Sequence, residues 1–277
     1  MKKATSGAQT SYANLEVYNM TKETIFECVI GAERYKHFIE VISEANPETS
    51  MTIGPEGINV RRMDPSHVVL VDAILPAHIF SEYKLRQEVS LGLDLENVQK
   101  FLKRASKDSI LVFKVDKETT DKGDKFVPSW KTCAKNTREY IGVDEDMYGD
   151  KIKTPKIFTD VKVVLDVKEL VKSIEDVELV SDHVTFEAND KFWLKGGTDS
   201  KVNVHYETGD PTLFEFVASR TAEATYNITY LKSLLKVVKD RVCLEFATNI
   251  PLVMKFDVAD GGEAIYILGP RVEREKQ

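Results

Sequence analysis

The chain has 277 residues, of which 42% are hydrophobic and 30% are charged, and its formal net charge is −7. This composition excludes a disordered chain and fits a soluble globular protein with room for two domains. No apolar run approaches the ~18 residues of a membrane span, and the first residues lack the apolar core of a secretory signal. The three dispersed cysteines favour a reducing compartment.

The first half of the chain is expected to be a flexible tail, residues 1–24, followed by strands and two amphipathic helices. A strand is predicted from Thr24. A helix follows Gly31, because its apolar residues recur at the spacing of one buried face, and Asn46-Pro47 ends it. Asp94 is the expected N-cap of a second helix. The other predictions are strands at 50–54, 58–63, 67–75, 109–116 and 135–141, and a long polar loop over 116–130.

The same order of elements restarts after a polar connector, residues 140–156. Asp166 is predicted to cap a helix over Val167–Glu175, and Asn227 to cap a helix over 228–239. The strands predicted for this half are 157–166, 177–189, 191–196, 201–207, 213–219, 241–248, 251–259 and 263–269.

A self-comparison indicates that the halves are duplicates. The helix that starts at Leu95 aligns with the helix that starts at Ile228, with Val98 over Leu231, and an alternating strand follows both. The sequence therefore predicts an α+β fold of two similar domains, with helices on one face of antiparallel sheets. The expected divisions are a tail at 1–24, domains at 25–139 and 157–277, and the connector at 140–156.

The outer faces of the predicted helices are basic although the chain is acidic overall. A lysine on a solvated helix face is common, but four such helices indicate a surface that meets phosphates without reading bases. The predicted DNA-contacting residues are Lys36, Lys100, Lys103, Arg104, Lys168, Lys172, Lys232, Lys236 and Lys239.

Catalytic and metal-binding motifs are lacking in this sequence. There is no phosphate-binding glycine loop, zinc-protease helix or nucleophile elbow. The acidic residues between Asp144 and Asp150 lack the spacing of a calcium loop. We therefore expect no catalytic residue, metal or cofactor, and a hydrolase that uses these acids stays the weaker alternative.

Two segments, 62–68 (RMDPSHV) and 266–273 (YILGPRVE), resemble the proliferating cell nuclear antigen family of DNA sliding clamps, of archaeal or eukaryotic type. The resemblance extends from about Thr24 to the C-terminus. It implies a ring of three subunits, hence of six similar domains, that encircles double-stranded DNA. Such a ring tethers DNA polymerase and other replication and repair proteins, needs a clamp loader, has no enzymatic activity and does not enter a membrane. The implied location is the cytoplasm or nucleoid of an archaeon, or a eukaryotic nucleus.

The resemblance also implies two protein-binding sites. One is a pocket for client peptides of the pattern Q-x-x-[ILM]-x-x-aromatic-aromatic, formed by Met63, His67, Val68, Leu70, Ile141, Val143, Met147, Pro251, Ile267, Gly269 and Pro270. Ile267 replaces an aromatic residue that is frequent there. The other is the subunit interface, at Lys135, Arg138, Tyr140, Phe192, Leu194 and Gly196. A subunit of a heterotrimeric or checkpoint-type clamp and a monomeric, non-specific DNA-binding protein remain alternatives.

Overall fold

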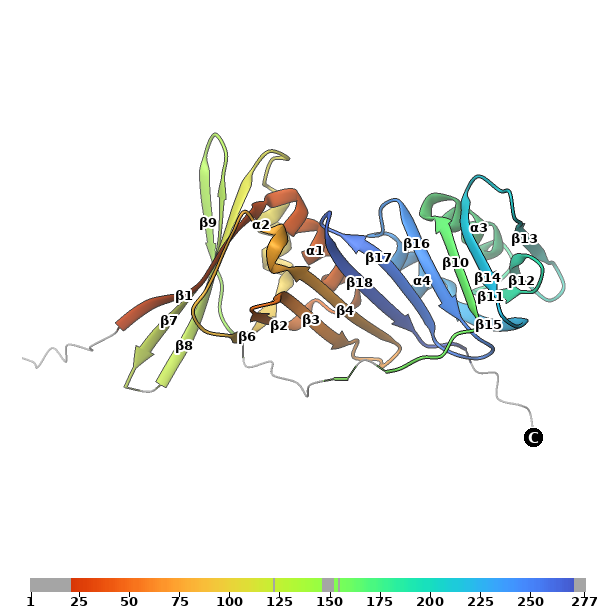
Figure 1. Ribbon diagram of the computed structural model, residues 1–277, viewed down its shortest axis with the longest axis horizontal. Coiled ribbons are helices and arrows are strands. Elements are labelled where there is room, and N and C mark those ends of the chain that lie inside the picture. Colours follow the sequence, from red (N-terminus) through yellow and green to blue (C-terminus); the bar gives the residue numbers. More distant parts are fainter. Residues whose placement is uncertain (1–20, 122, 146–151, 154, 272–277) are drawn as a thin grey trace, which may run out of the picture.

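The computed structural model describes residues 21–121, 123–145, 152–153 and 155–271, which form two similar halves placed side by side (Figure 1). The elements of the first half are β1 (Thr21–Gly31), α1 (Ala32–Ala45), β2 (Glu48–Gly54), β3 (Gly57–Met63), β4 (Val69–Pro76), the 3-10 turn Ala77–Ile79, β5 (Glu82–Leu85), β6 (Val89–Asp94), α2 (Leu95–Leu102), β7 (Ile110–Thr120), β8 (Gly123–Cys133) and β9 (Thr137–Ile141). The elements of the second half are β10 (Val161–Asp166), α3 (Val167–Glu178), β11 (His183–Ala188), β12 (Phe192–Gly196), β13 (Val202–Tyr206), β14 (Leu213–Ala218), β15 (Ala222–Asn227), α4 (Ile228–Leu235), β16 (Arg241–Phe246), β17 (Leu252–Val258) and β18 (Gly262–Leu268).

The strands form three antiparallel sheets whose order repeats between the halves. The first half contributes a block β5-β1-β7-β8-β9 and a block β4-β3-β2-β6; the second half contributes β14-β10-β16-β17-β18 and β13-β12-β11-β15. Each block of one half thus has a counterpart in the other. Pairing of β18 with β4, from Glu263 opposite Ile74 to Leu268 opposite Val69, joins two blocks into one nine-stranded sheet across the halves. The predicted duplication and fold class are confirmed.

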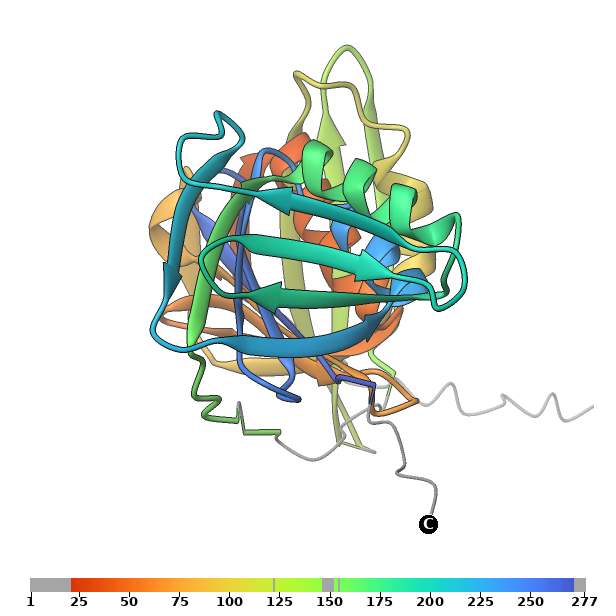
Figure 2. The ribbon, with the colours of Figure 1, turned by 90° about the vertical axis from the view of Figure 1, so that its right-hand side faces the viewer.

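The four helices lie together over one face of the sheets, in the spatial order α2, α1, α4, α3 (Figures 1 and 2). Three of them start at a predicted N-cap. Asp94 accepts a hydrogen bond from Glu96 N, Asp166 accepts one from Lys168 N, and Asn227 accepts one from Tyr230 N. These side chains satisfy amide groups that the first helical turn leaves without partners. None of the helices in the described part of the chain is long and apolar enough to cross a membrane.

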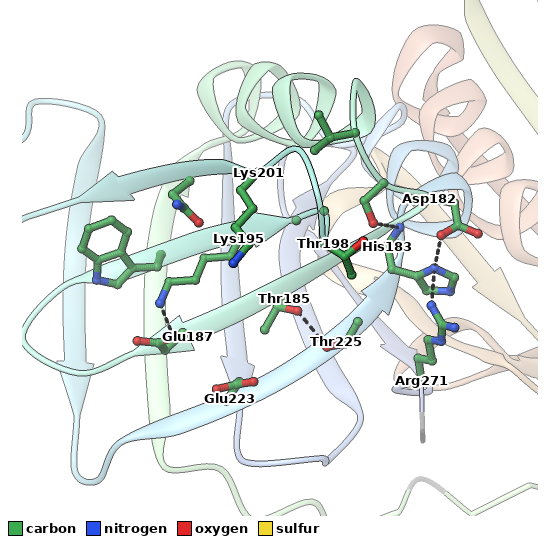
Figure 3. A pocket seen from close by; sticks show the side chains of 16 residues that line it. Asp182, His183, Thr185, Glu187, Lys195, Thr198, Lys201, Glu223, Thr225 and Arg271 are labelled. Carbon is green, nitrogen blue, oxygen red and sulfur yellow. Dashed lines mark hydrogen bonds and ion pairs between the residues drawn. The ribbon is translucent and has the colours of Figure 1, made fainter. Parts of the chain in front are cut away.

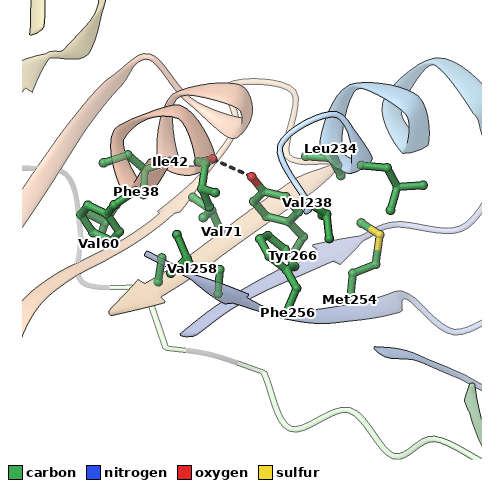
Figure 4. Close-up of a cluster of buried hydrophobic side chains, with 14 of the residues drawn as sticks. Phe38, Ile42, Val60, Val71, Leu234, Val238, Met254, Phe256, Val258 and Tyr266 are labelled. Carbon is green, nitrogen blue, oxygen red and sulfur yellow. Dashed lines mark hydrogen bonds between the residues drawn. The ribbon is translucent and has the colours of Figure 1, made fainter. Parts of the chain in front are cut away.

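A continuous apolar core lies between this helix layer and the sheets, and it continues from one half into the other (Figure 4). Tyr266 of β18 is fully buried under α1, and its hydroxyl donates a hydrogen bond to Val41 O at 2.6 Å. The burial removes apolar surface from water, while this bond satisfies the one polar atom of the side chain. The core therefore holds α1 of the first half on a strand of the second half.

His37 of α1 makes a second connection between the halves. Ala259 N donates a hydrogen bond to Nδ1 at 3.2 Å, so Nδ1 carries no proton, and Nε2 donates to Val237 O at 2.8 Å. The ring is buried and neutral in this arrangement. Its pKa lies below the usual value, first because burial disfavours the charged form and then because Lys239 is near; the Val237 carbonyl, Glu40 and Asp260 oppose this shift.

We expect His37 to make folding stability depend on pH. Because its folded-state pKa is lowered, the unfolded chain binds the proton more tightly, so this contribution to stability is full above about pH 6.5 and falls as the pH drops further. His37→Gln keeps a donor and an acceptor but does not titrate. Urea unfolding between pH 7.5 and 5.5 should show a smaller loss of unfolding free energy for the variant than for the wild type. Equal losses would contradict this role.

Several predicted boundaries were wrong. The stretch 116–130 is no loop: β7 and β8 pair to the end of their hairpin, where Thr120 lies opposite Gly123. Ion pairs such as Lys117–Asp124, at 2.7 Å, follow this ribbon, so its strands need no apolar alternation. β1 begins at Thr21, inside the expected tail, and residues 1–20 lie outside the described part. The helix α3 runs to Glu178, and strands β5, β6 and β15 were not predicted.

Candidate nucleic-acid interface and peptide-binding surface

The nine predicted DNA-contacting residues all lie on the helix layer or in the turns that follow α2 and α4, but they differ in their partners. Four of the lysines are paired with carboxylates. Lys36 contacts Glu33 at 3.3 Å, Lys100 contacts Glu96 at 2.7 Å, Lys172 contacts Glu169 at 2.6 Å, and Lys232 contacts Glu178 at 2.6 Å. The hydrogen bond from Lys232 to Glu178 is the first cause of the raised pKa of this lysine. These four charges are partly neutralised in place.

The other five residues are exposed and have no ion pair within the described part of the chain. They are Lys103, Arg104, Lys168, Lys236 and Lys239. Lys103 follows α2 and Lys236 follows α4, and both line one hollow of about 350 Å³ over α1, together with Glu40 and Glu44. The duplicated turns thus bring two equivalent lysines together. This face combines free cations with acids, and it suits weak contacts to phosphates.

A separate apolar cluster lies on the outer face of the nine-stranded sheet, away from the helices. Leu70 of β4, Val253 of β17 and Ile267 of β18 are buried there at 2%, 6% and 7% exposure. The partly buried side chains around them are Met63, Ile152, Ile157 and Ile265. Alternate residues of β18, among them Tyr266 and Leu268, enter the main core instead. At one end of β4, β17 and β18 the residues on both faces are apolar, so an apolar cluster forms on the outer face as well. Ile152 and Ile157 pack against it.

A hollow of about 570 Å³ adjoins this cluster, and Met63, His67 and Ile152 belong to its lining. Asp64 shapes its rim. The Asp64 carboxylate accepts hydrogen bonds from Ser66 N at 3.1 Å, Val68 N at 2.7 Å and Val69 N at 2.6 Å. These bonds hold the turn after β3, in which His67 has a positive φ of 57°. The turn keeps Met63 and His67 beside each other at the mouth of the hollow.

The structure brings together only part of the predicted client pocket. Met63, Leu70 and Ile267 meet in the outer cluster, and His67 lines the adjacent hollow. Val68 packs against the main core, and its carbonyl accepts a bond from Gly269 N at 2.9 Å. Pro251 and Pro270 are partly buried beside these strands without joining the cluster. Met147 lies outside the described residues.

Ile141 and Val143 lie apart from the other predicted pocket residues. Their side chains are 62% and 59% exposed, and neither joins the outer cluster. Gly142 N binds Pro128 O at 2.8 Å, and Glu145 N binds Gly92 O at 2.9 Å, so this end of the connector follows β8 and β6. The described connector residues that do reach the cluster are Ile152 and, just after the predicted connector, Ile157.

The sheet order bears on the two strands of the predicted subunit interface in different ways. β9 pairs only with β8 among the described strands, and Lys135 and Arg138 are exposed in its turn and strand, while Tyr140 packs against Trp130. On the other side of the predicted interface, β12 lies between β13 and β11 and has no free edge for pairing. Phe192 and Leu194 are fully buried, and Gly196 lies against Val177 of α3. The edge strands of this four-stranded sheet are β13 and β15, and β13 is the one next to β12.

A third hollow, of about 910 Å³, lies over the outer face of β11, β12 and β15 (Figure 3). Arg271, which follows β18, reaches it and places Nη1 at 2.9 Å from His183 Nδ1, while Asp182 Oδ1 lies 2.5 Å from the same nitrogen. Charged and hydroxyl side chains, including Glu187, line much of it. It lacks an apolar cluster like that at Leu70, so it is the weaker candidate for holding apolar peptide anchors.

The acidic connector is not arranged as an active site in its described part. Asp144 Oδ1 accepts a hydrogen bond from Gly92 N at 2.8 Å and holds the connector on β6. Across the described ranges, no group of three or more His, Cys, Asp and Glu side chains is placed to hold a metal ion. Asp146 and Asp150 lie outside these ranges.

Sequence reasoning missed the residues that complete the outer cluster: Ile152, Ile157, Val253 and Ile265. A signal for them was available. Residues 252–254 and 264–268 are apolar without alternation, which predicts apolar side chains on both faces of these strands, and an isolated isoleucine in a charged connector needs an apolar contact.

Three comparisons place these features among known proteins. A sequence model of the proliferating cell nuclear antigen N-terminal domain matches residues 26–136. A DNA polymerase sliding clamp of Thermococcus gammatolerans is 31% identical over 259 residues, which cover 92% of this chain and 100% of the relative. The structure of PCNA from Thermococcus kodakaraensis has a TM-score of 0.81 at 29% identity, covering 89% of this chain and 100% of that one. A structure of A. fulgidus PCNA with the C-terminal region of FEN-1 bound shares the fold, with a TM-score of 0.78 at 22% identity over 90% of this chain and 100% of that one.

Proposed function

Because this chain belongs to the family of DNA polymerase sliding clamps, we propose that it closes into a ring around duplex DNA and tethers DNA polymerase and other replication and repair proteins there. The observation that carries this proposal is the repeated order of the strand blocks. One junction between blocks, β18 with β4, forms within the chain, whereas the strands equivalent to them, β9 and β13, do not pair with each other. The relatives are archaeal, and we propose the cytoplasm or nucleoid as its location. The role is structural and has no catalytic step.

Ring closure follows from the duplication. Within the chain, β18 at the end of a five-stranded block pairs with β4 at the edge of a four-stranded block. The counterparts of these strands are β9 and β13, which each have one free side among the described strands. Pairing of β9 with β13 of the next subunit would repeat the internal junction and cover both edges. Repetition of one head-to-tail contact closes a ring when the rotation permits.

Helix contacts and charges support the same arrangement. Within the chain α4 touches α1, so their counterparts, α2 of one subunit and α3 of the next, would touch at the new junction. The α2–β9 end carries Lys103, Arg104 and Arg138, and Arg138 Nη1 binds Arg104 O at 2.8 Å. α3 carries the exposed acids Glu175, Asp176 and Glu178, of which Glu175 and Glu178 also contact Lys232 of α4 within the same subunit, at 3.5 and 2.6 Å. We propose that these opposite charges set the head-to-tail orientation. Arg104 then belongs as much to the interface as to the DNA surface.

The helix layer is the proposed DNA-facing surface. Its five free cations offer loose contacts to phosphates, while enclosure by the ring retains the DNA. Apolar anchors of client peptides are proposed to bind the outer cluster on the opposite face of the sheet. DNA and client proteins would therefore use opposite faces, and a bound polymerase would not compete with the DNA inside the ring.

We predict that the connector residues at the cluster, not those at its exposed start, govern client binding. Ile152→Ser with Ile157→Ser should weaken the binding of a peptide of the pattern Q-x-x-[ILM]-x-x-aromatic-aromatic by about tenfold or more, because each change removes apolar contact area. Ile141→Ser with Val143→Ser is the matched control and should bind nearly as the wild type does. Isothermal titration calorimetry measures both. The opposite ranking of the two variants would return the site to Ile141 and Val143.

A further inference from the structure

We propose that the hollow beside the outer cluster binds a carboxylate of the client peptide through Arg62, so that this clamp prefers clients with an acidic residue next to their apolar anchor. The proposal rests on the proposed client site. The outer cluster offers only apolar contacts to a peptide, and Arg62 would add one charged contact that distinguishes between clients.

The hollow lies where two neighbouring strands part. β2 and β3 pair from Gly54 opposite Gly57 as far as Met51 opposite Val60, and no further. Beyond that point the first residues of β2 pair with β6, and the last residues of β3 pair with β4. Asn46 and Glu48 line the hollow on one side, and Arg62 and Asp64 line it on the other. Residues of β2 and β3 therefore line the hollow on both sides, and the pairing of these strands fixes its position.

Arg62 lines this hollow, and its side chain has a hydrogen-bond donor without a partner in the described part of the chain. Its Nε is shielded from solvent and has no hydrogen-bond partner among the described residues, whereas the neighbouring Arg61 binds Asp72 at 2.9 Å. Buried donors in proteins normally have partners, and a carboxylate fits the planar donor pattern of a guanidinium group. Since Nε itself is closed to solvent, an acceptor from outside the subunit would reach the guanidinium group of Arg62 after this side chain turns into the hollow.

The acids near Arg62 do not fill this role. The Asp64 carboxylate already accepts hydrogen bonds from three backbone N–H groups, at Ser66, Val68 and Val69. Glu48 is exposed and has no ion pair with Arg62. Because Glu48 lines the same hollow, its charge would repel a peptide carboxylate, so removal of this charge should strengthen binding of acidic peptides.

The position of the hollow identifies the occupant. Met63 and Ile152 belong both to the hollow and to the outer cluster. A peptide whose apolar anchor rests on the cluster would therefore carry its neighbouring residues over the hollow. The ligand chemistry that fits is an apolar anchor flanked by a carboxylate, within one extended or short helical peptide.

The test is calorimetric titration of the full chain with pairs of synthetic peptides that share the apolar anchors of the client pattern. Each pair differs only by Glu or Gln at one non-anchor position. One Glu peptide should bind the wild type about tenfold more tightly than its Gln partner, because hydrogen bonds to charged groups are strong. Arg62→Gln should remove that difference without changing the affinity for the Gln peptide. Glu48→Gln should enlarge it.

Arg61→Gln is the matched control, because Arg61 is paired with Asp72, and it should keep the difference. Equal affinities within every Glu/Gln pair for the wild type would overturn the proposal while leaving the client site in place. Equal weakening of all peptides by Arg62→Gln would also overturn it, since that pattern indicates a structural role. Failure of every peptide to bind the wild type would instead reject the client site itself.

Discussion

Reversing two charges at the α2–β9 end is expected to dissociate the ring. With Arg104→Glu and Arg138→Glu, this end would face the acids of α3 with like charge, and such contacts cost on the order of several kcal/mol at an interface. Each junction of the ring contains the same contact, so the penalty recurs at every one. Light scattering of the variant at micromolar concentration should give the mass of a monomer, where the wild type gives that of a trimer.

The control for this experiment is a compensating change in the same chain. Adding Glu175→Lys and Asp176→Lys restores opposite charges across the junction and should restore the trimer. The change removes the Glu175–Lys232 ion pair at 3.5 Å within the subunit, but Lys232 keeps its shorter pair with Glu178. Circular dichroism should show that all variants keep the fold, because the four positions are exposed. A reversed-charge variant that remains a trimer, or a rescue that fails while each chain is folded, would contradict the charge pairing at this junction.

Neutralising the free cations of the helix layer is expected to weaken DNA contact more than neutralising the paired ones. Lys103→Gln, Lys168→Gln and Lys236→Gln together remove three ammonium groups that have no ion pair in the described structure. Each phosphate contact contributes about 0.9 to the slope of log affinity against log salt. Fluorescence anisotropy with linear duplex DNA should therefore show a clearly shallower slope, with the trimer intact.

The matched variant carries Lys100→Gln, Lys172→Gln and Lys232→Gln, with the same change in net charge. Its lysines are paired with Glu96, Glu169 and Glu178, so the loss of slope should be smaller. Equal slopes for the two variants would mean that only total charge matters. Slopes unchanged from the wild type in both would remove the helix layer from the DNA-facing role.

Local chemistry made the helices predictable. The caps Asp94, Asp166 and Asn227 and the buried helix faces depend on residues within one or two turns of each other, and the structure has them where the sequence predicts. The 116–130 ribbon was missed for the opposite reason. Its strands are held by backbone pairing and surface ion pairs, which leave no apolar alternation to detect.

The order of strands in the sheets decides which predicted site residues lie together. β12 and β13 both look like edge candidates in sequence, and only the sheet order shows that β13 has the free side. In the same way, Ile141 and Ile152 are equally apolar residues of one connector. The hydrogen bonds from Gly142 N to Pro128 O and from Glu145 N to Gly92 O hold the segment around Ile141 along β8 and β6. Ile152 lies beyond this segment and packs against the outer cluster. Such long-range pairing is not encoded in residue spacing.

Encirclement is the central claim, and retention on closed DNA tests it most directly. The protein is placed on a nicked circular plasmid by a clamp loader and washed at a salt concentration that suppresses phosphate contacts. The account predicts that the protein stays on the circle and leaves within the same wash once a restriction enzyme linearises the plasmid. Equal retention on circular and linear DNA, or equal loss from both, would contradict it.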